Sequence, residues 1–286
     1  MPRSIANLSQ PQQDLLASWL PDAHVTHDYS WGLVETTVLR VESGGATYTV
    51  KAGGPSDGHI SRELAAHTWW LEPWVSRGRA PRLAHGDAAA KLLVTTYLPG
   101  DLVLGSPAQQ LPSTFRQAGE LLALLHGQPG KEDDTFEVAE NNKALRWLDQ
   151  AHRINSDLTE RLRAIIASWP TQTIMLVPTH GDWQPRNWLS QNGTVSVIDL
   201  GRAALRPAFT DLIRLDAQDF RDDPSGQLER AFYDGYGADP RTSGLWPRAK
   251  LREAIGTAVW AHRVGDEPFE AQGHRMIDEW LAEFGS

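Results

Sequence analysis

The sequence predicts an α+β fold with two lobes, a small strand-rich lobe followed by a larger helical one. The first third contains short stretches with β-branched residues and alternating polarity, which are typical of strands. Beyond Pro99-Gly100, apolar residues recur at helical spacing almost to the C-terminus. We therefore expect one domain over residues 1–98 and a second over residues 99–286, joined by a short hinge at residues 97–100.

The first lobe should contain a hairpin, a helix and a further strand. Strand patterns occupy residues 33–41, 46–52 and 91–98. The sequence Ser43-Gly44-Gly45 predicts the hairpin turn between the first two strands, because glycine adopts the positive φ that tight turns require. One helical stripe follows, formed by Ile60, Leu64, His67 and Leu71. Pro73 should end or kink that helix.

The second lobe should be mainly helical, with two short strands beside a loop. Helical spacing covers residues 115–125, with Gly127 as a C-terminal stop, and residues 158–169. Strands are expected at 173–177 and 194–198. Residues beyond 209 are again predicted to be helical, with breaks near Asp239-Pro240 and Glu267-Pro268.

Composition narrows the class of protein. The 286 residues include 27 Lys and Arg against 36 Asp and Glu, a net charge of −9, which argues against a nucleic-acid partner. Cysteine is absent, which excludes disulfides and thiolate zinc sites. The sequence has neither a signal-peptide pattern nor an apolar run of about 18 residues. We expect a cytoplasmic protein without membrane contact.

The segment from Thr179 to Trp188 and the later Asp199 carry the strongest chemical pattern. They place two carboxylates, Asp182 and Asp199, and the carboxamide of Asn187 where short apolar strands meet a tight loop. Phosphoryl transfer uses such groups, because one carboxylate orients a hydroxyl while an Asn and a second carboxylate hold Mg²⁺. The alternative is structural, with His-Gly-Asp as a common turn and Asp199 as the end of a strand.

The pattern His-x-Asp-x-x-x-x-Asn, followed by an Asp after the next strand, resembles the aminoglycoside phosphotransferase and choline kinase-like family. The resemblance implies a bilobal protein-kinase-like fold that binds ATP, or GTP, and Mg²⁺ between its lobes. It further implies that Asp182 is the catalytic base and that Asn187 and Asp199 bind Mg²⁺. His180 should organise the loop through hydrogen bonds to the backbone.

Two positions in the loop depart from the family pattern. Gln184 stands where the family often has His, and Arg186 stands where a small residue is frequent. These departures affect the expected shape of the loop beside the phosphates, while the expected role of Asp182 is unchanged.

The resemblance also implies nucleotide contacts in the first lobe. Lys51 should bind the α- and β-phosphates and Glu63 should orient it. The backbone C=O of Thr96 and N–H of Leu98 should bind adenine at the hinge. The turn around Ser30 either covers the phosphates through its N–H groups and hydroxyl or is a plain surface turn.

The acceptor is expected to be a small molecule with a hydroxyl group. Asp216 and Asp219, in an acidic run with Asp222 and Asp223, either attract a cationic acceptor or form a solvated face. Trp183 flanks the catalytic loop and is predicted to stack on a sugar, a choline-like cation or adenine.

The leading hypothesis is an ATP- and Mg²⁺-dependent O-phosphotransferase, with an aminoglycoside or another cationic antibiotic as the acceptor. One alternative is a metabolic kinase for choline, ethanolamine, homoserine, methylthioribose or a similar amino alcohol or sugar. A third is a kinase-like protein that binds nucleotide without catalysis. The joint presence of Lys51, Asp182, Asn187 and Asp199 argues against this last alternative.

Overall fold

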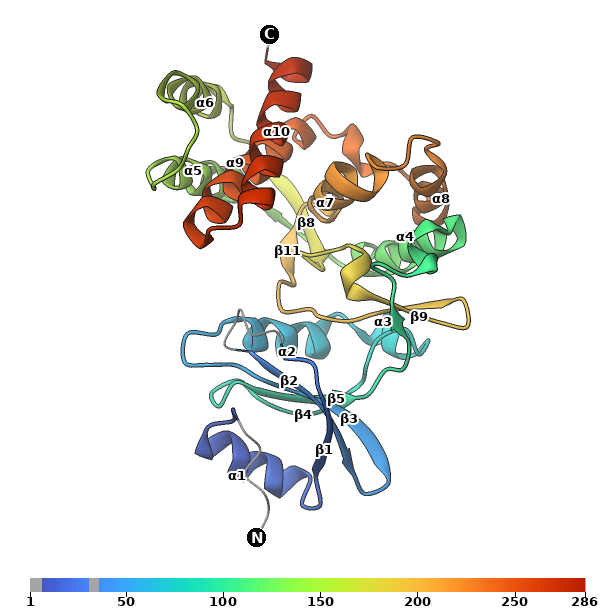
Figure 1. The fold of residues 1–286 in the computed structure, drawn as a ribbon. Coiled ribbons are helices and arrows are strands. Elements are labelled where there is room, and N and C mark those ends of the chain that lie inside the picture. Colours follow the sequence, from blue (N-terminus) through green and yellow to red (C-terminus); the bar gives the residue numbers. More distant parts are fainter. Residues whose placement is uncertain (1–6, 31–35, 286) are drawn as a thin grey trace. The chain divides into compact units, whose positions relative to one another are not determined.

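The structure, a computed structural model, describes residues 7–30 and 36–285 (Figure 1). The chain forms two compact units. Unit 1 combines the described residues up to 128 with residues 180–204 and 225–237, and unit 2 contains residues 129–179, 205–224 and those from 238 onward. The α+β class is confirmed. The lobe boundary after residue 98 stays a prediction.

Unit 1 is built on a five-stranded antiparallel sheet with strand order β1-β2-β3-β5-β4. Its strands are β1 (His24–Asp28), β2 (Thr37–Ser43), β3 (Ala46–Ala52), β4 (Leu83–Asp87) and β5 (Leu92–Thr96). Ser43 pairs with Ala46 across the predicted hairpin, where Gly44 and Gly45 both have positive φ. Of the predicted first strand, residues 33–35 lie outside the described residues.

Two helices cover the opposite faces of this sheet (Figure 1). Helix α1 (Gln10–Trp19) packs Leu16 into a buried cluster with Val50 of β3 and Val94 of β5. Successive side chains of a strand point to opposite faces, so Lys51 points away from α1. The ion pair of Lys51 with Glu63 places it on the face of α2 (His59–Trp69).

The rest of unit 1 contains a small sheet and further helices. The sheet has strand order β10-β9-β6, with β6 (Asp101–Leu102), β9 (Trp188–Gln191) and β10 (Thr194–Val197). The α-helices are α3 (Glu72–Val75), α4 (Pro112–His126) and α8 (Gln227–Tyr236), and the 3₁₀ turns are η1 (Pro107–Gln110) and η2 (Pro185–Asn187). Gly127 follows α4 directly, as predicted, and Pro73 lies in the first turn of α3.

Helices α4 and α8 approach each other through glycine. A Cβ atom at Gly119 would lie 2.1 Å from the carbonyl oxygen of Phe232, and one at Gly235 would lie 2.0 Å from that of Arg116. Real side chains do not approach a backbone atom so closely, so each glycine lets the partner helix pack directly on its backbone. The pair of glycines therefore sets the distance between α4 and α8.

We expect Gly119→Ala to lower the free energy of unfolding by about 1–3 kcal/mol, because the added methyl group must push the two helices apart. Alanine alone favours a helix over glycine by about 1 kcal/mol, so the sign of the change is informative. Gly256→Ala is the matched control, since its added Cβ would meet only ring atoms of Trp147, no closer than 3.6 Å. Urea unfolding of both variants measures the difference, and a Gly119→Ala protein as stable as Gly256→Ala would contradict the prediction.

Unit 2 contains a three-stranded sheet and most of the C-terminal helices. Its sheet has the order β11-β8-β7, with β7 (Lys131–Asp133), β8 (Ile174–Thr179) and β11 (Ala204–Arg206). Its α-helices are α5 (Phe136–Leu148), α6 (Ser156–Ser168), α7 (Ile213–Leu215), α9 (Trp246–Val264) and α10 (Glu267–Phe284). The 3₁₀ turns η3 (Ala208–Leu212) and η5 (Pro240–Thr242) and the π-helical turn η4 (Asp216–Phe220) complete it.

The core of unit 2 lies between α5, α6, α9 and α10. Buried apolar residues from these four helices, such as Leu162, Ile255 and Ile277, form one cluster. Beside it, the buried Glu137 accepts two hydrogen bonds from Arg252, at 2.9 and 2.7 Å. The charge of Glu137 is therefore compensated within the protein. Among the described helices of both units, none has the length and apolar composition needed to cross a membrane.

Candidate active site

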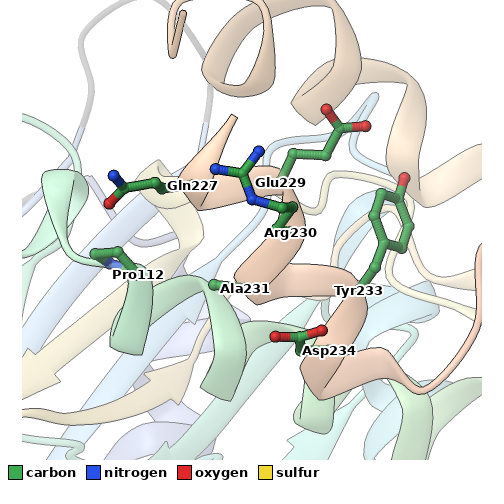
Figure 2. Close-up of a pocket in the computed structure, with 7 residues that line it drawn as sticks. All are labelled: Pro112, Gln227, Glu229, Arg230, Ala231, Tyr233 and Asp234. Carbon is green, nitrogen blue, oxygen red and sulfur yellow. The ribbon is translucent and has the colours of Figure 1, made fainter. Parts of the chain in front are cut away.

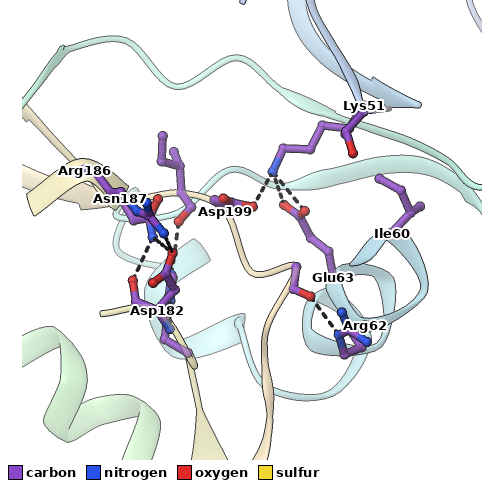
Figure 3. A network of polar contacts seen from close by, with 12 residues as sticks. Lys51, Ile60, Arg62, Glu63, Asp182, Arg186, Asn187 and Asp199 are labelled. Atoms are coloured by element: carbon purple, nitrogen blue, oxygen red, sulfur yellow. Dashed lines mark hydrogen bonds and ion pairs between the residues drawn. The ribbon is translucent and has the colours of Figure 1, made fainter. Parts of the chain in front are cut away.

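Lys51 lies at the centre of a three-residue ion-pair cluster in unit 1 (Figure 3). Its Nζ atom donates to both carboxylate oxygens of Glu63, each at 2.9 Å, and to Oδ1 of Asp199 at 3.2 Å. The Glu63 side chain is only 4% exposed, whereas that of Asp199 is 53% exposed. The cluster therefore holds a lysine between a buried carboxylate and a solvent-facing one.

The charges of this cluster control its protonation. Burial alone would lower the pKa of Lys51, but the charges of Asp199 and Glu63 outweigh it and raise that pKa. The charge of Lys51 lowers the pKa of Asp199, against the opposing effects of partial desolvation and of the negative charge of Asp182. Burial raises the pKa of Glu63, and Lys51 opposes that rise. Lys51 thus stays a cation and Asp199 an anion at neutral pH.

Asp199 occupies an unusual backbone conformation. Its φ of 63° lies in the left-handed region, which Asp and Asn tolerate better than most other residues. Hydrogen bonds hold the chain on both sides, from Ile198 N–H to Asn187 C=O at 3.0 Å and from Arg62 Nε to Gly201 C=O at 2.8 Å. Strained residues of this kind concentrate at functional sites, so the turn supports a functional reading of Asp199.

His180 fixes the loop that carries Asp182. Its Nδ1 atom accepts a hydrogen bond from the backbone N–H of Asp182 at 3.3 Å, which leaves Nε2 as the donor to the C=O of Ile198 at 3.1 Å. The ring also packs edge-on against Trp183. The predicted role of His180, which is to organise the loop through the backbone, is confirmed.

The carboxylate of Asp182 is nearly buried and accepts hydrogen bonds from three side chains. Gln184 Nε2 donates to Oδ1 at 2.5 Å, while Arg186 Nη2 and Asn187 Nδ2 donate to Oδ2 at 2.6 and 3.0 Å. Gln184 and Arg186 are the two positions that depart from the family pattern. Sequence reasoning marked both as departures but did not predict that they bind Asp182. The separation of four residues permits the contact of Arg186 with Asp182, but the turn that Pro185 opens determines it.

Asn187 and Asp199 together offer oxygen ligands of the kind that Mg²⁺ prefers. Asn187 donates from Nδ2 to the backbone and side chain of Asp182. Its Oδ1 accepts no hydrogen bond within the described residues and is available to a metal ion. In the described part of the chain, no cluster of three or more His, Cys, Asp or Glu side chains could hold a metal ion. A site with few protein ligands fits Mg²⁺, which usually takes one or two carboxylates and completes its shell with phosphates and water.

The other predicted nucleotide contacts lie at, or shortly after, the ends of strands of the five-stranded sheet. The Ser30 hydroxyl accepts a hydrogen bond from Val38 N–H at 3.0 Å. Of the turn predicted over residues 28–32, Trp31 and Gly32 lie outside the described residues. Thr96 ends β5, and Leu98 follows in an irregular segment before β6. The contacts of Ser30, Thr96 and Leu98 with nucleotide stay predictions.

The structure does not favour the acceptor contacts predicted for Trp183 and Asp216. Trp183 is fully buried and packs against Trp74 and Trp188, so its ring faces are not available to a ligand. In unit 2, Asp216 accepts from Arg241 Nη1 at 2.9 Å and lies 3.0 Å from Lys250 Nζ. Its charge is therefore compensated within the protein. Asp219 lies in the same turn η4, and its predicted role stays a prediction.

A surface groove in unit 1 does not contain the predicted site residues. It has a volume of about 510 Å³ and is lined by residues of α8 together with Pro112, the first residue of α4 (Figure 2). Its lining combines Tyr233 with charged residues such as Arg230 and Asp234. The groove is thus distinct from the cluster around Lys51 and Asp182.

The antiparallel sheet with a lysine–glutamate pair, followed by a loop with Asp, Asn and a further Asp, defines the class of kinase-like phosphotransferases. Residues 29–251 match the phosphotransferase enzyme family, APH, and the chain belongs to this family. The prediction of a small-molecule phosphotransferase is confirmed. No curated protein matches the chain significantly.

Solved structures share the fold at low sequence identity. A thermostable mutant of aminoglycoside phosphotransferase APH(4)-Ia, in ternary complex with AMP-PNP and hygromycin B, is 14% identical with a TM-score of 0.68, covering 97% of this chain and 100% of that one. Choline kinase LicA from Streptococcus pneumoniae is 15% identical with a TM-score of 0.68, covering 95% and 98%. Macrolide 2'-phosphotransferase MphH from Brachybacterium faecium is 17% identical with a TM-score of 0.58, covering 92% and 95%.

Proposed function

We propose that the protein transfers the γ-phosphoryl group of ATP to a hydroxyl group of a small molecule. The observation that carries this proposal is the contact of Lys51 with both Glu63 and Asp199. A buried glutamate orients the lysine for phosphate, and an exposed aspartate beside it is available to a metal ion. The nucleotide complex of the APH(4)-Ia mutant, which shares the fold, is consistent with this assignment.

Asp182 acts as the base in this proposal. As the acceptor oxygen forms its bond to the γ-phosphorus, the bond from that phosphorus to the β-phosphate oxygen breaks, and ADP leaves with the electron pair. The hydroxyl proton passes to the carboxylate of Asp182. Gln184 and Asn187 hold that carboxylate in one orientation, so it can align the hydroxyl as well as accept its proton.

Asn187 and Asp199 would hold Mg²⁺, which neutralises charge on the phosphates when bound. Lys51 binds the α- and β-phosphates in the same proposal. The ion pair of Lys51 with Asp199 would loosen as each side chain gains a new partner, while the buried contact with Glu63 remains to anchor the lysine.

The acceptor is a small molecule that bears a hydroxyl group, and two classes remain. A polycationic aminoglycoside needs uncompensated carboxylates, and the compensated charge of Asp216 does not support it. An amino alcohol or sugar of lower charge needs fewer such groups. We infer that the second class is favoured, and we retain aminoglycosides as the alternative.

The test is a screen for acceptor-dependent ADP formation, with ATP and with GTP, in the presence and absence of Mg²⁺. The acceptors are aminoglycosides, macrolides, choline, ethanolamine and neutral sugars. We expect one class to stimulate ADP release and to gain one phosphoryl group by mass spectrometry. Binding of ATP without transfer to any acceptor in such a panel would instead favour the non-catalytic alternative.

A further inference from the structure

Arg186 presents a cation with spare hydrogen-bonding capacity beside Asp182. Its Nη2 atom donates to Asp182 Oδ2 at 2.6 Å, and the side chain is 42% exposed. This is the one hydrogen bond that its guanidinium makes with the described residues. Arginine is a multiple donor in a planar fork, so most of its N–H groups remain available to an anion.

The backbone around Arg186 is fixed even though its side chain is exposed. Pro185 opens the three-residue turn η2, which is closed by a hydrogen bond from Asn187 N–H to Gln184 C=O at 2.9 Å. A second hydrogen bond joins Leu104 N–H to Pro185 C=O at 3.2 Å. The backbone of Arg186 is thus held in place, while its exposed guanidinium can change position.

Movement of Arg186 would open one oxygen of Asp182 to the acceptor hydroxyl. A general base must offer an oxygen to the hydroxyl whose proton it accepts. Oδ2 already accepts from two donors and Oδ1 accepts from Gln184, while the side chain is only 6% exposed. Arg186 is the one of these three donors whose side chain is substantially exposed and therefore has room to leave.

The transferring phosphoryl group lies within reach of such a movement. A hydroxyl lies about 3 Å from its base and about 3–3.5 Å from the atom that it attacks. The phosphorus would therefore lie roughly 6 Å from Asp182, next to a guanidinium that already contacts that carboxylate. Arginine binds phosphate oxygens in a bidentate manner, and an arginine placed beside the transferring group stabilises the charge on its oxygens in the transition state.

We propose that Arg186 exchanges its partner, from Asp182 Oδ2 in the nucleotide-free protein to the oxygens of the transferring phosphoryl group. The exchange opens a position on Oδ2 of Asp182 for the hydroxyl proton, and Arg186 stays protonated throughout. This inference rests on the proposed function, since it requires a phosphoryl group at the site. It assigns to one exposed side chain both the shielding of the base and the stabilisation of transferred charge.

Calorimetric titration with MgADP, in the presence and absence of aluminium fluoride, tests the exchange without knowledge of the acceptor. Aluminium fluoride stands in for the phosphoryl group in flight, so the gain in affinity that it produces measures the stabilisation of that group. We expect Arg186→Met to bind MgADP about as well as the wild-type protein does. The gain in affinity from aluminium fluoride should be at least about tenfold smaller in this variant than in the wild-type protein. Arg186→Lys keeps the charge without the planar fork and should give an intermediate gain.

Arg116→Met is the matched control. Arg116 is 50% exposed, belongs to the same unit and contacts one carboxylate, Asp234, at 3.1 Å. Its loss should leave the gain from aluminium fluoride unchanged. If Arg186→Met does not fold, Arg186→Lys tests the exchange instead. Its gain in affinity from aluminium fluoride is expected to be several-fold below that of the wild-type protein.

An equal gain in the wild-type protein and in the Arg186 variants, whatever its size, would overturn the exchange and leave Arg186 as a fixed partner of Asp182. A wild-type protein that does not bind MgADP would instead overturn the proposed function itself, and the exchange with it. The two failures are therefore distinguished by the titration without aluminium fluoride.

Discussion

Asp182→Asn is expected to reduce kcat by about 10²- to 10⁴-fold while ATP still binds, because an amide cannot accept the hydroxyl proton. The fold should survive the change. The new amide oxygen can accept from Arg186 and Asn187, while its NH₂ group faces Gln184, whose own amide can rotate to present an oxygen. The loss should therefore appear in turnover and not in stability.

Three measurements on the same preparation separate these effects. They are kcat with the acceptor identified by the screen, the Kd of MgATP by calorimetry, and the free energy of unfolding. Asp234→Asn is the control, since Asp234 contacts Arg116 on the surface of unit 1 and is not assigned a role in transfer. Near wild-type turnover of Asp182→Asn would remove Asp182 from the role of base.

The hairpin of the first sheet was predictable because its signals are local. Residues 46–52 form β3 as expected, since alternation along the strand and the two glycines of the turn point to the same structure. Helix α6 likewise follows its apolar period. In such segments the local pattern and the tertiary contacts agree.

The first helix and strand were not predicted, because their signals are not local. Helix α1 buries Gln12, whose amide donates to the C=O groups of Gly53 and Ala90, more than forty residues away. A buried glutamine breaks the apolar period on which helix prediction depends. All residues of β1 are exposed, so this strand cannot show the alternation of a half-buried strand.

The contacts of the candidate site also include some that were predictable from the sequence and some that were not. The pairing of Lys51 with Glu63 was predictable from a strand lysine and a following helix, and the structure contains it. Asp216 pairs with Arg241 and Lys250, which come from later segments of the chain. The acidic run alone therefore could not reveal that the charge of Asp216 is compensated. The contact of Arg186 with Asp182 depends on the turn that Pro185 opens, which the motif pattern does not specify.

Asp199→Asn is expected to remove most of the effect of Mg²⁺ on ATP binding. Asparagine keeps the size of the side chain and tolerates the left-handed backbone at this position better than alanine does. Mutations of groups that merely support metal ligands cost about 10- to 100-fold in metal affinity, so loss of a charged ligand should cost at least about tenfold. Without Mg²⁺, ATP should bind no more weakly than to the wild-type protein, because Lys51 loses a competing anion near the phosphates.

Glu63→Gln should behave differently and thereby isolates the metal effect. Glu63 holds Lys51 from the buried side, so its loss should weaken ATP binding equally with and without Mg²⁺. Calorimetric titration of both variants with ATP, at matched ionic strength with and without Mg²⁺, gives the ratio of the two affinities for each protein. That ratio should collapse in Asp199→Asn and persist in Glu63→Gln. If Asp199→Asn retains the wild-type ratio, Asp199 serves only as a partner of Lys51, and the metal must be held by other groups.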